Sequence, residues 1–248
     1  MYEQFAQIYD RFMTDVDYES WAKWLCALYE KYGKSGQLTI LDAACGTGSM
    51  TIQLAEAGHL LTGADSSEDM LREASEKARN NGFHIPFVEQ EMQRLALHKK
   101  CDVVNCACDG VNYLLDEAQV MAFFSSAYDV LKPNGLLCFD VSSRYKLENI
   151  LAGNIFGEDD GHAAYLWRNA YDEKSRLLEM QLSFFIKKGE LYERFTERHI
   201  QRAHEQAELT AYLKRVGFAV VVVLETWSDN APSPKSERIQ FVAVKSDR

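Results

Sequence analysis

The residues best suited to do chemistry form the run Asp42 to Gly48, which reads Asp-Ala-Ala-Cys-Gly-Thr-Gly. A β-type run over 38–41 precedes it and a helical run over 50–57 follows it. Small residues let the backbone approach a ligand closely, and a helix start offers free N–H groups to an anion. A strand that ends in an acid, followed by a glycine loop and a helix, indicates a pocket for a nucleoside-bearing cofactor.

Two cofactor classes fit a glycine loop of this kind. A nicotinamide dinucleotide loop requires G-x-G-x-x-G, in which the third small residue packs the helix against the strand. Counting from Gly46, the third position is Thr51, and its β-branched side chain fits that position poorly. An NAD-dependent oxidoreductase is therefore the less favoured alternative.

Further residues follow the glycine loop in a fixed order. They are Asp65 after the second expected strand, Glu91-Met92 after the third, and Leu131-Lys132-Pro133-Asn134-Gly135 before the fifth. With this set the chain resembles the class I S-adenosylmethionine-dependent methyltransferases over essentially its whole length. The opening pattern Tyr2-x-x-Phe5-Ala6-x-x-Tyr9-Asp10 is similar to that of small bacterial methyltransferases without an assigned function. The resemblance implies S-adenosyl-L-methionine as cofactor and a seven-stranded sheet whose last strand is antiparallel.

The resemblance also implies roles for single residues. Asp65 is expected to accept hydrogen bonds from the ribose hydroxyls, with a turn or cap acid before Ser66 and Ser67 as the alternative. Glu91 is expected to face the adenine amino group. Asp42 is expected to order the loop near the amino group of the cofactor. Tyr9 is expected to close over its methionine end, with a core aromatic as the alternative. Ala44 replaces a glycine common in the family, which is tolerable if its φ is negative. The expected cofactor-binding residues are Tyr9, Asp42, Ala44, Cys45, Gly46, Thr47, Gly48, Asp65, Ser66, Met70, Glu91, Met92, Cys108 and Asp109.

Hydrophobic patterning predicts an α/β fold for the elements that position these residues. β-type and helical segments alternate up to about residue 150, and the run 103–108 is apolar like a parallel strand buried on both faces. We predict a doubly wound, mostly parallel sheet from residues 1–152 and 203–248, with 1–32 as a helical cap broken at 15–17. Residues 153–202 alternate in polarity and predict an antiparallel β insert that covers the substrate or forms a dimer surface. The elements expected are helices over 50–57, 67–80, 117–131 and 205–216, core strands over 38–42, 59–65, 87–88, 103–108, 136–141, 218–225 and 238–244, and three insert strands over 163–171, 177–187 and 190–200.

Methyl transfer from a sulfonium is an in-line displacement, so positioning of the acceptor and exclusion of water can supply much of the catalysis. A base is needed only when the acceptor atom is protonated at the working pH, so a dedicated catalytic residue can be absent. At the end of the fourth strand, Asp109 and Asn112 are candidates for contacting the sulfonium and the acceptor, with strand-end and helix-cap roles as the alternative. His199 is a candidate general base, although an exposed strand histidine is the simpler interpretation. Cys108 follows Ala107 rather than proline, unlike a cytosine-C5 nucleophile, which favours a buried cysteine.

Composition limits the partners. The net charge of −10 argues against broad binding to nucleic acid or anionic membranes, and the longest apolar run, 218–224, is too short to span a bilayer. The six cysteines form no C-x-x-C pair and no histidines cluster, so no metal is expected. Without a signal-peptide pattern, the chain is expected to be cytoplasmic. We predict a methyltransferase for a small-molecule N or O acceptor. An RNA-directed methyltransferase or a non-catalytic cofactor-binding module is the alternative, and a homodimer stays open.

Overall fold

The computed structural model describes residues 6, 8–13 and 16–246, so Tyr2, Phe5 and Asp15 of the predicted cap lie outside it. The core begins with a cap and three β–α units: η1 (Asp10–Phe12), α2 (Tyr18–Lys31), β1 (Thr39–Ala43), α3 (Ser49–Glu56), β2 (Leu60–Asp65), α4 (Glu68–Asn80), β3 (Phe87–Glu89) and η2 (Met92–Arg94). It continues with β4 (Cys101–Cys106), η3 (Gly110–Tyr113), α5 (Glu117–Val130), β5 (Leu131–Ser142) and η4 (Lys146–Leu151). After the insert strands β6 (Ile155–Asp159), β7 (Ala163–Asp172), β8 (Leu177–Lys188) and β9 (Leu191–Arg202), it closes with α6 (Gln206–Val216), β10 (Phe218–Glu225) and β11 (Arg238–Lys245).

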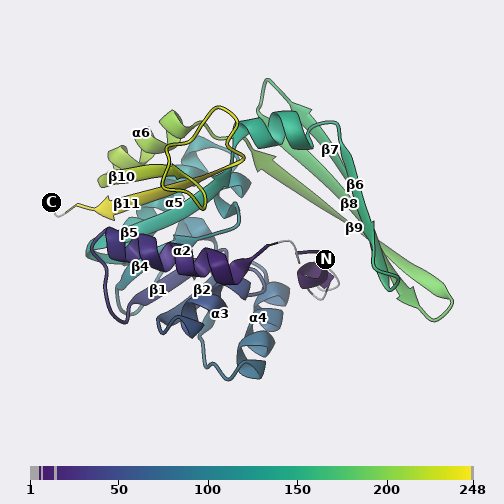
Figure 1. The fold of residues 1–248 in the computed structure, drawn as a ribbon, viewed down its shortest axis with the longest axis horizontal. Coiled ribbons are helices and arrows are strands. Elements are labelled where there is room, and N and C mark those ends of the chain that lie inside the picture. The colour runs from purple at the N-terminus through teal and green to yellow at the C-terminus, as the bar shows by residue number, and fades with distance from the viewer. Residues whose placement is uncertain (1–5, 7, 14–15, 247–248) are drawn as a thin grey trace.

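The core sheet has seven strands in the order β10-β11-β5-β4-β1-β2-β3. β11 is antiparallel to both of its neighbours, whereas β5, β4, β1, β2 and β3 run parallel. One apolar cluster joins α2 and α3 to one face of the sheet, and a second joins α5 and α6 to the other (Figure 1). The predicted fold class, with its antiparallel last strand, is therefore confirmed.

Helix α4 shows how local sequence places a site residue. The hydroxyl of Ser67 accepts a hydrogen bond from the backbone N–H of Met70 at 3.3 Å, so Ser67 is the predicted N-cap. The predicted inward stripe of Met70, Leu71, Ala74 and Ala78 is buried. Because this stripe fixes the helix against the sheet, the start of α4 and the carboxyl end of β2 meet at Asp65.

The insert differs from the prediction by one strand. It is a separate four-stranded antiparallel sheet in the order β6-β7-β8-β9, and the sequence analysis missed β6. β6 is an edge strand with a central glycine, Gly157, and most of its residues are exposed, so no alternation of polarity marks it. Figure 1 shows the long hairpins of this sheet extending away from the core. Within the described ranges, no helix combines the length and apolar character needed to cross a bilayer.

Two apolar contacts attach the insert to the rest of the molecule. Leu147 and Leu151 of η4 pack against Leu178 and Met180. Toward the tips of the hairpins, Phe184 joins a cluster with Ala6, Ile8 and Met70, residues of the N-terminal segment and of α4. The inner face of the insert therefore lies over the N-terminal cap and the start of α4.

Candidate active site

The glycine loop after β1 leaves open space at its centre. Gly46 and Gly48 adopt φ values of 54° and 75°, the left-handed region that glycine reaches without strain. A Cβ atom built on Gly46 would have no heavy atom within 4 Å. A Cβ on Gly48 would lie 3.0 Å from the Cβ of Ala74, so α4 packs directly on the loop there. A ligand therefore has room to approach the backbone at Gly46.

The backbone of Ala44 differs from the prediction. Its φ is 53°, so the expectation that a methyl group is tolerated through a negative φ is wrong. An alanine in this region carries a steric cost of about 1–2 kcal/mol. The methyl group in turn limits position 110, since a Cβ built on Gly110 would be 3.1 Å from it.

Asp65 joins the glycine loop to α4. Its Oδ2 accepts a hydrogen bond from the backbone N–H of Gly46, and its Oδ1 accepts one from Ser67, both at 2.9 Å. The backbone N–H of Ser66 also stabilises the carboxylate. An ionised carboxylate has about four lone-pair sites, so Asp65 can accept a further hydrogen bond from a ribose hydroxyl. Burial raises the pKa of this carboxyl. Ser66 lies beside it and is exposed.

The carboxylate of Asp42 forms hydrogen bonds with buried side chains of the protein. It is buried, and its Oδ2 accepts a hydrogen bond from Thr51 Oγ1 at 2.5 Å. Its Oδ1 accepts one from Asn105 Nδ2 at 2.8 Å, and Asn105 in turn accepts one from the hydroxyl of Tyr29 at 3.1 Å. Burial raises the pKa of Asp42 to about 6. The chain of bonds ties β1, α3, β4 and α2 together, which agrees with a loop-ordering role.

The N-terminal cap is attached to the same loop by Asp10. Its Oδ1 accepts a hydrogen bond from Thr47 Oγ1 at 2.7 Å, and its other oxygen pairs with Lys77 of α4. Lys77 also donates to Thr47 Oγ1 at 3.1 Å and to Ser49 Oγ at 2.9 Å. These contacts bring the neighbouring Tyr9 to the site, and they were not predicted from the sequence.

The residues after β3 lie at the same edge of the sheet. The backbone N–H of Gln90 donates to the carbonyl oxygen of Asp65 at 2.9 Å. Glu91 is exposed, with one carboxylate oxygen 3.9 Å from Arg94 Nε. Met92 is half-buried, and its sulfur lies 3.7 Å from Cys106 Sγ. Glu91 and Met92 thus lie where a base held beside Asp65 could reach them.

The chain turns sharply after β4, which ends at Cys106 instead of the predicted Cys108. Cys108 and Asp109 have φ values of 63° and 54°. The Cys108 sulfur lies 3.9 Å from the hydroxyl of Tyr18, and burial raises the pKa of the thiol to about 12. It is therefore protonated at neutral pH and is no ready nucleophile. Burial also raises the pKa of the Tyr9 hydroxyl, with Cys108, Tyr18 and Asp109 as further contributors.

A buried ionic network holds this turn. Asp109 pairs with Arg238 of β11 at 2.8 Å, and its Oδ2 accepts a hydrogen bond from Gln201 Nε2 at 2.7 Å. Its backbone N–H donates to Oδ2 of Asp140 at 3.1 Å, and Asp140 also pairs with Arg238. The guanidinium lies 5.3 Å from the ring centroid of Trp21. Although burial opposes its charge, the two carboxylates raise the pKa of Arg238.

The sequence analysis missed Arg238, Asp140 and Gln201. One signal was available, because Asp140 is the single acid in the apolar run 136–141. A carboxylate on a strand buried on both faces requires a cationic partner. The partner is 98 positions away, so its identity was not accessible from the sequence.

Asn112 and His199 differ in what surrounds them. Asn112 is buried, and its amide bonds to the backbone of Ser142 in both directions and to the carbonyl oxygen of Arg202. Its observed contacts are therefore structural. His199 is only 9% exposed, so the interpretation as an exposed strand histidine is wrong. Its Nδ1 lies 3.4 Å from the hydroxyl of Tyr113, and burial lowers its pKa.

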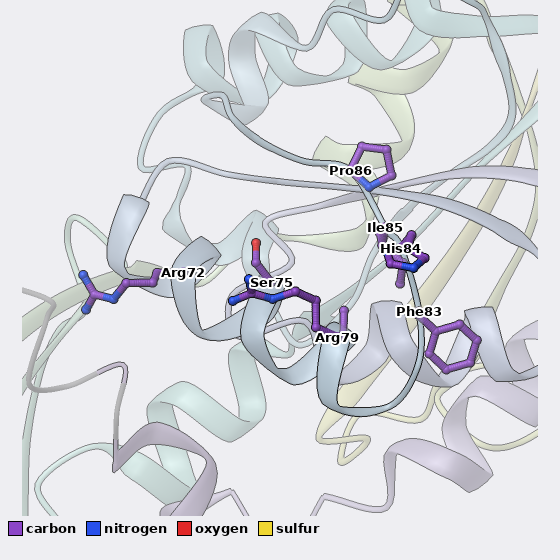
Figure 2. Close-up of a pocket in the computed structure, with 8 residues that line it drawn as sticks. Arg72, Ser75, Arg79, Phe83, His84, Ile85 and Pro86 are labelled. Atoms are coloured by element: carbon purple, nitrogen blue, oxygen red, sulfur yellow. The ribbon is translucent and has the colours of Figure 1, made fainter.

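A separate hollow lies between α4 and the segment Phe83–Pro86 that follows it (Figure 2). Figure 2 shows the segment Phe83–Pro86 running alongside the helix that carries Arg72, Ser75 and Arg79. None of the expected cofactor-binding residues lines it. The site described above is therefore distinct from this hollow.

Comparison with known proteins gives consistent matches. Residues 40–135 match the family described as "Methyltransferase domain". "Putative methyltransferase YqeM" of Bacillus subtilis is 38% identical over 99% of this chain and 98% of its own length. The crystal structure of an S-adenosylmethionine-dependent methyltransferase from Clostridium acetobutylicum is 31% identical, with a TM-score of 0.89 over 99% of both chains. CalS10 from Micromonospora echinaspora, an amino pentose methyltransferase solved with S-adenosylmethionine bound, shares the fold at 20% identity, with a TM-score of 0.76 over 96% of this chain and 97% of its own.

Proposed function

Because the chain belongs to the class I S-adenosylmethionine-dependent methyltransferases, we propose that it transfers the methyl group to a nitrogen or oxygen atom of a small molecule. The observation that carries this proposal is the meeting of two groups of residues at the carboxyl edge of the sheet. Asp65 bonds to the glycine loop at Gly46, and the insert reaches the turn after β4 through the Gln201–Asp109 bond. A donor site and an acceptor cover at this one edge would match the way doubly wound folds arrange ligand sites, which supports the proposal.

The residues present fit S-adenosylmethionine. Asp65 would hold the ribose hydroxyls, and the open space at Gly46 would admit the methionine portion of the cofactor. Glu91 and the backbone of Met92 would face the adenine. The remaining members of the proposed site are Tyr9, Asp42, Ala44, Cys45, Thr47, Gly48, Ser66, Met70, Cys108 and Asp109. When bound, the cofactor supplies an electrophilic methyl group on a sulfonium.

The acceptor side is assigned to groups at the turn after β4. Tyr9 and Tyr18 come from the cap, and Tyr113 and His199 approach from η3 and the insert. Such a cover orients an acceptor and keeps water away, which are the main requirements of an in-line displacement. His199, with its pKa lowered by burial, is neutral at pH 7 and can accept a proton from an acceptor. The amino pentose enzyme of the same fold and the acidic charge of this chain both support a small-molecule acceptor.

Calorimetry with S-adenosylhomocysteine tests the donor site. Asp65→Asn should weaken binding by about 1.5–3 kcal/mol, because the ribose hydroxyls lose a charged acceptor. Glu68→Gln is the matched control, since it removes an exposed carboxylate three residues away and should leave the affinity unchanged. Equal affinities for the Asp65→Asn variant and the wild type would place the ribose elsewhere.

A further inference from the structure

The inner face of the insert carries polar side chains in a buried position. Along β9, alternate residues share one face of the strand, so Glu197, His199 and Gln201 point to the same side. The register places Leu182 of β8 opposite Glu197 and Trp167 of β7 opposite Leu182. Leu182 packs against both apolar clusters that attach the insert. Glu197 therefore lies between these two apolar contacts, on a face that also carries His199 and Gln201.

Glu197 is an acid in this apolar setting. It is 4% exposed, and its Oε1 accepts no hydrogen bond from the part of the chain that the structure describes. No Lys, Arg or His among the described residues forms an ion pair with it, whereas Glu193 on the same strand pairs with Lys188. Burial raises the pKa of this carboxyl, and the positive charge of the amino terminus of the chain partly opposes that rise. A buried carboxylate without a hydrogen-bonded cation is costly, and a cation brought by a ligand would lower that cost.

Two neighbouring groups on the same face show unused hydrogen-bonding capacity. Asn169 Nδ2 donates to the carbonyl oxygen of Asn154 at 3.2 Å, which leaves Oδ1 as a buried acceptor without a partner among the described residues. The indole Nε1 of Trp167 is a buried donor in the same situation. An acid and an amide oxygen suit N–H and O–H donors, and the indole suits one acceptor oxygen.

This face is connected to the place where the methyl group is expected. Gln201 bonds to Asp109 in the turn after β4, and His199 contacts Tyr113 of η3. Glu197 lies two residues from His199, about 7 Å further along the strand. A molecule held at Glu197 would thus lie on the same face of β9 as the two residues that contact the turn after β4 and η3.

We propose that Glu197 recognises a protonated amine on the methyl acceptor, whose hydroxyl groups contact Asn169 and Trp167. The substrate class is therefore a small polyhydroxylated or hydroxylated amine rather than a neutral alcohol or an acid. This inference rests on the proposed function, because it concerns the acceptor of the same site. Glu197 is assigned recognition and not proton transfer.

Binding to the full chain saturated with S-adenosylhomocysteine tests the inference. Glucosamine and cyclohexylamine serve as probes, and glucose and cyclohexanol are their neutral counterparts. The amines should bind, and Glu197→Gln should weaken their binding by about 10- to 100-fold, the range for losing a hydrogen bond between charged groups. The neutral counterparts should bind weakly and respond to the substitution much less. Glu190→Gln, at the exposed turn between β8 and β9, removes the same charge and should change nothing.

The affinity for S-adenosylhomocysteine distinguishes failure of the proposed function from failure of the inference about Glu197. A wild-type protein that does not bind it refutes the proposed function and the inference together. If the wild type binds it but binds no amine, or binds amine and alcohol equally, the inference alone is refuted. A Glu197→Gln variant that loses S-adenosylhomocysteine as well shows a structural role for Glu197 and also refutes the inference. Because this carboxylate has no partner among the described residues, the variant should melt no earlier than the wild type.

Discussion

Replacing Arg238 by methionine should expose how the turn after β4 is held. The substitution leaves Asp109 and Asp140 without their cation, and Asp140 is completely buried. Breaking a buried ion pair by removing one partner costs about 3–5 kcal/mol. For a chain of this length each kcal/mol corresponds to about 2–4 °C, so Tm should fall by about 6–20 °C. Differential scanning calorimetry at pH 7.5 measures this directly.

Two comparisons make the Arg238 result specific. Arg215→Met breaks an ion pair with Glu117 in which both side chains are more than half exposed, and it should cost less than about 1 kcal/mol. The double variant Arg238→Met with Asp140→Asn should recover part of the lost stability, because the uncompensated charge of the completely buried Asp140 is removed. If Arg238→Met were no more destabilising than Arg215→Met, the buried network would not be what fixes the turn.

The loss of stability caused by Arg238→Met should also depend on pH in a defined direction. Burial raises the folded-state pKa of Asp140 even with Arg238 present, and removing the cation raises that pKa further. A carboxyl whose folded pKa lies above its unfolded pKa stabilises the fold more as the pH falls. The difference in stability between the variant and the wild type should therefore shrink between pH 7.5 and pH 5. A constant difference would mean that lost packing, and not charge, explains the effect.

Two further changes test single backbone and side-chain positions. Ala44→Gly relieves the strain of the left-handed backbone and should raise the free energy of unfolding by about 0.5–1 kcal/mol, a value that already includes the entropy lost by glycine on folding. Ala55→Gly in α3 should lower the free energy of unfolding by about 1 kcal/mol. Urea titration distinguishes these opposite signs. Burial lowers the pKa of His204 to about 4, so the unfolded chain binds a proton first as the pH falls. This difference should cost about 2 kcal/mol between pH 7.5 and pH 5. His204→Asn should lack that part of the acid destabilisation in parallel urea titrations, and an unchanged pH profile would contradict the assignment.

The fold was predictable because its elements carry local signals. Ser67 caps α4 as predicted, and the strand Phe218–Glu225 has the predicted limits. The end of β4 was not predictable in this way. Cys106, Ala107 and Cys108 look like one apolar strand, but Asp140 accepts the backbone N–H of Asp109 and the chain turns early. A long-range hydrogen bond decided a boundary that local pattern could not.

The candidate site divides along the same line. The residues proposed for the cofactor side could be grouped from the sequence, because Asp42, Gly46, Gly48 and Asp65 lie close together along the chain, in or just after the first two strands. The contacts of the proposed acceptor side could not be found in this way, since they join residues about 90 positions apart, such as Asp109 with Gln201. Alternation of polarity in β9 marks two faces but does not say which one is inward when both are polar. For that reason His199 was placed on the wrong side.

The inward residues of β9 show how a structural strand can also hold a ligand. Gln201, nearest the core, bonds to Asp109, and His199 contacts Tyr113. Both bonds connect the insert to the turn after β4. Glu197, the next inward residue toward the hairpin tip, has the same orientation and is equally buried, yet no described side chain pairs with it. If all three residues served only stability, an apolar residue at position 197 would give a more stable fold, because the desolvation of a carboxylate would be avoided. The amine that we propose for the substrate would offset that cost at Glu197.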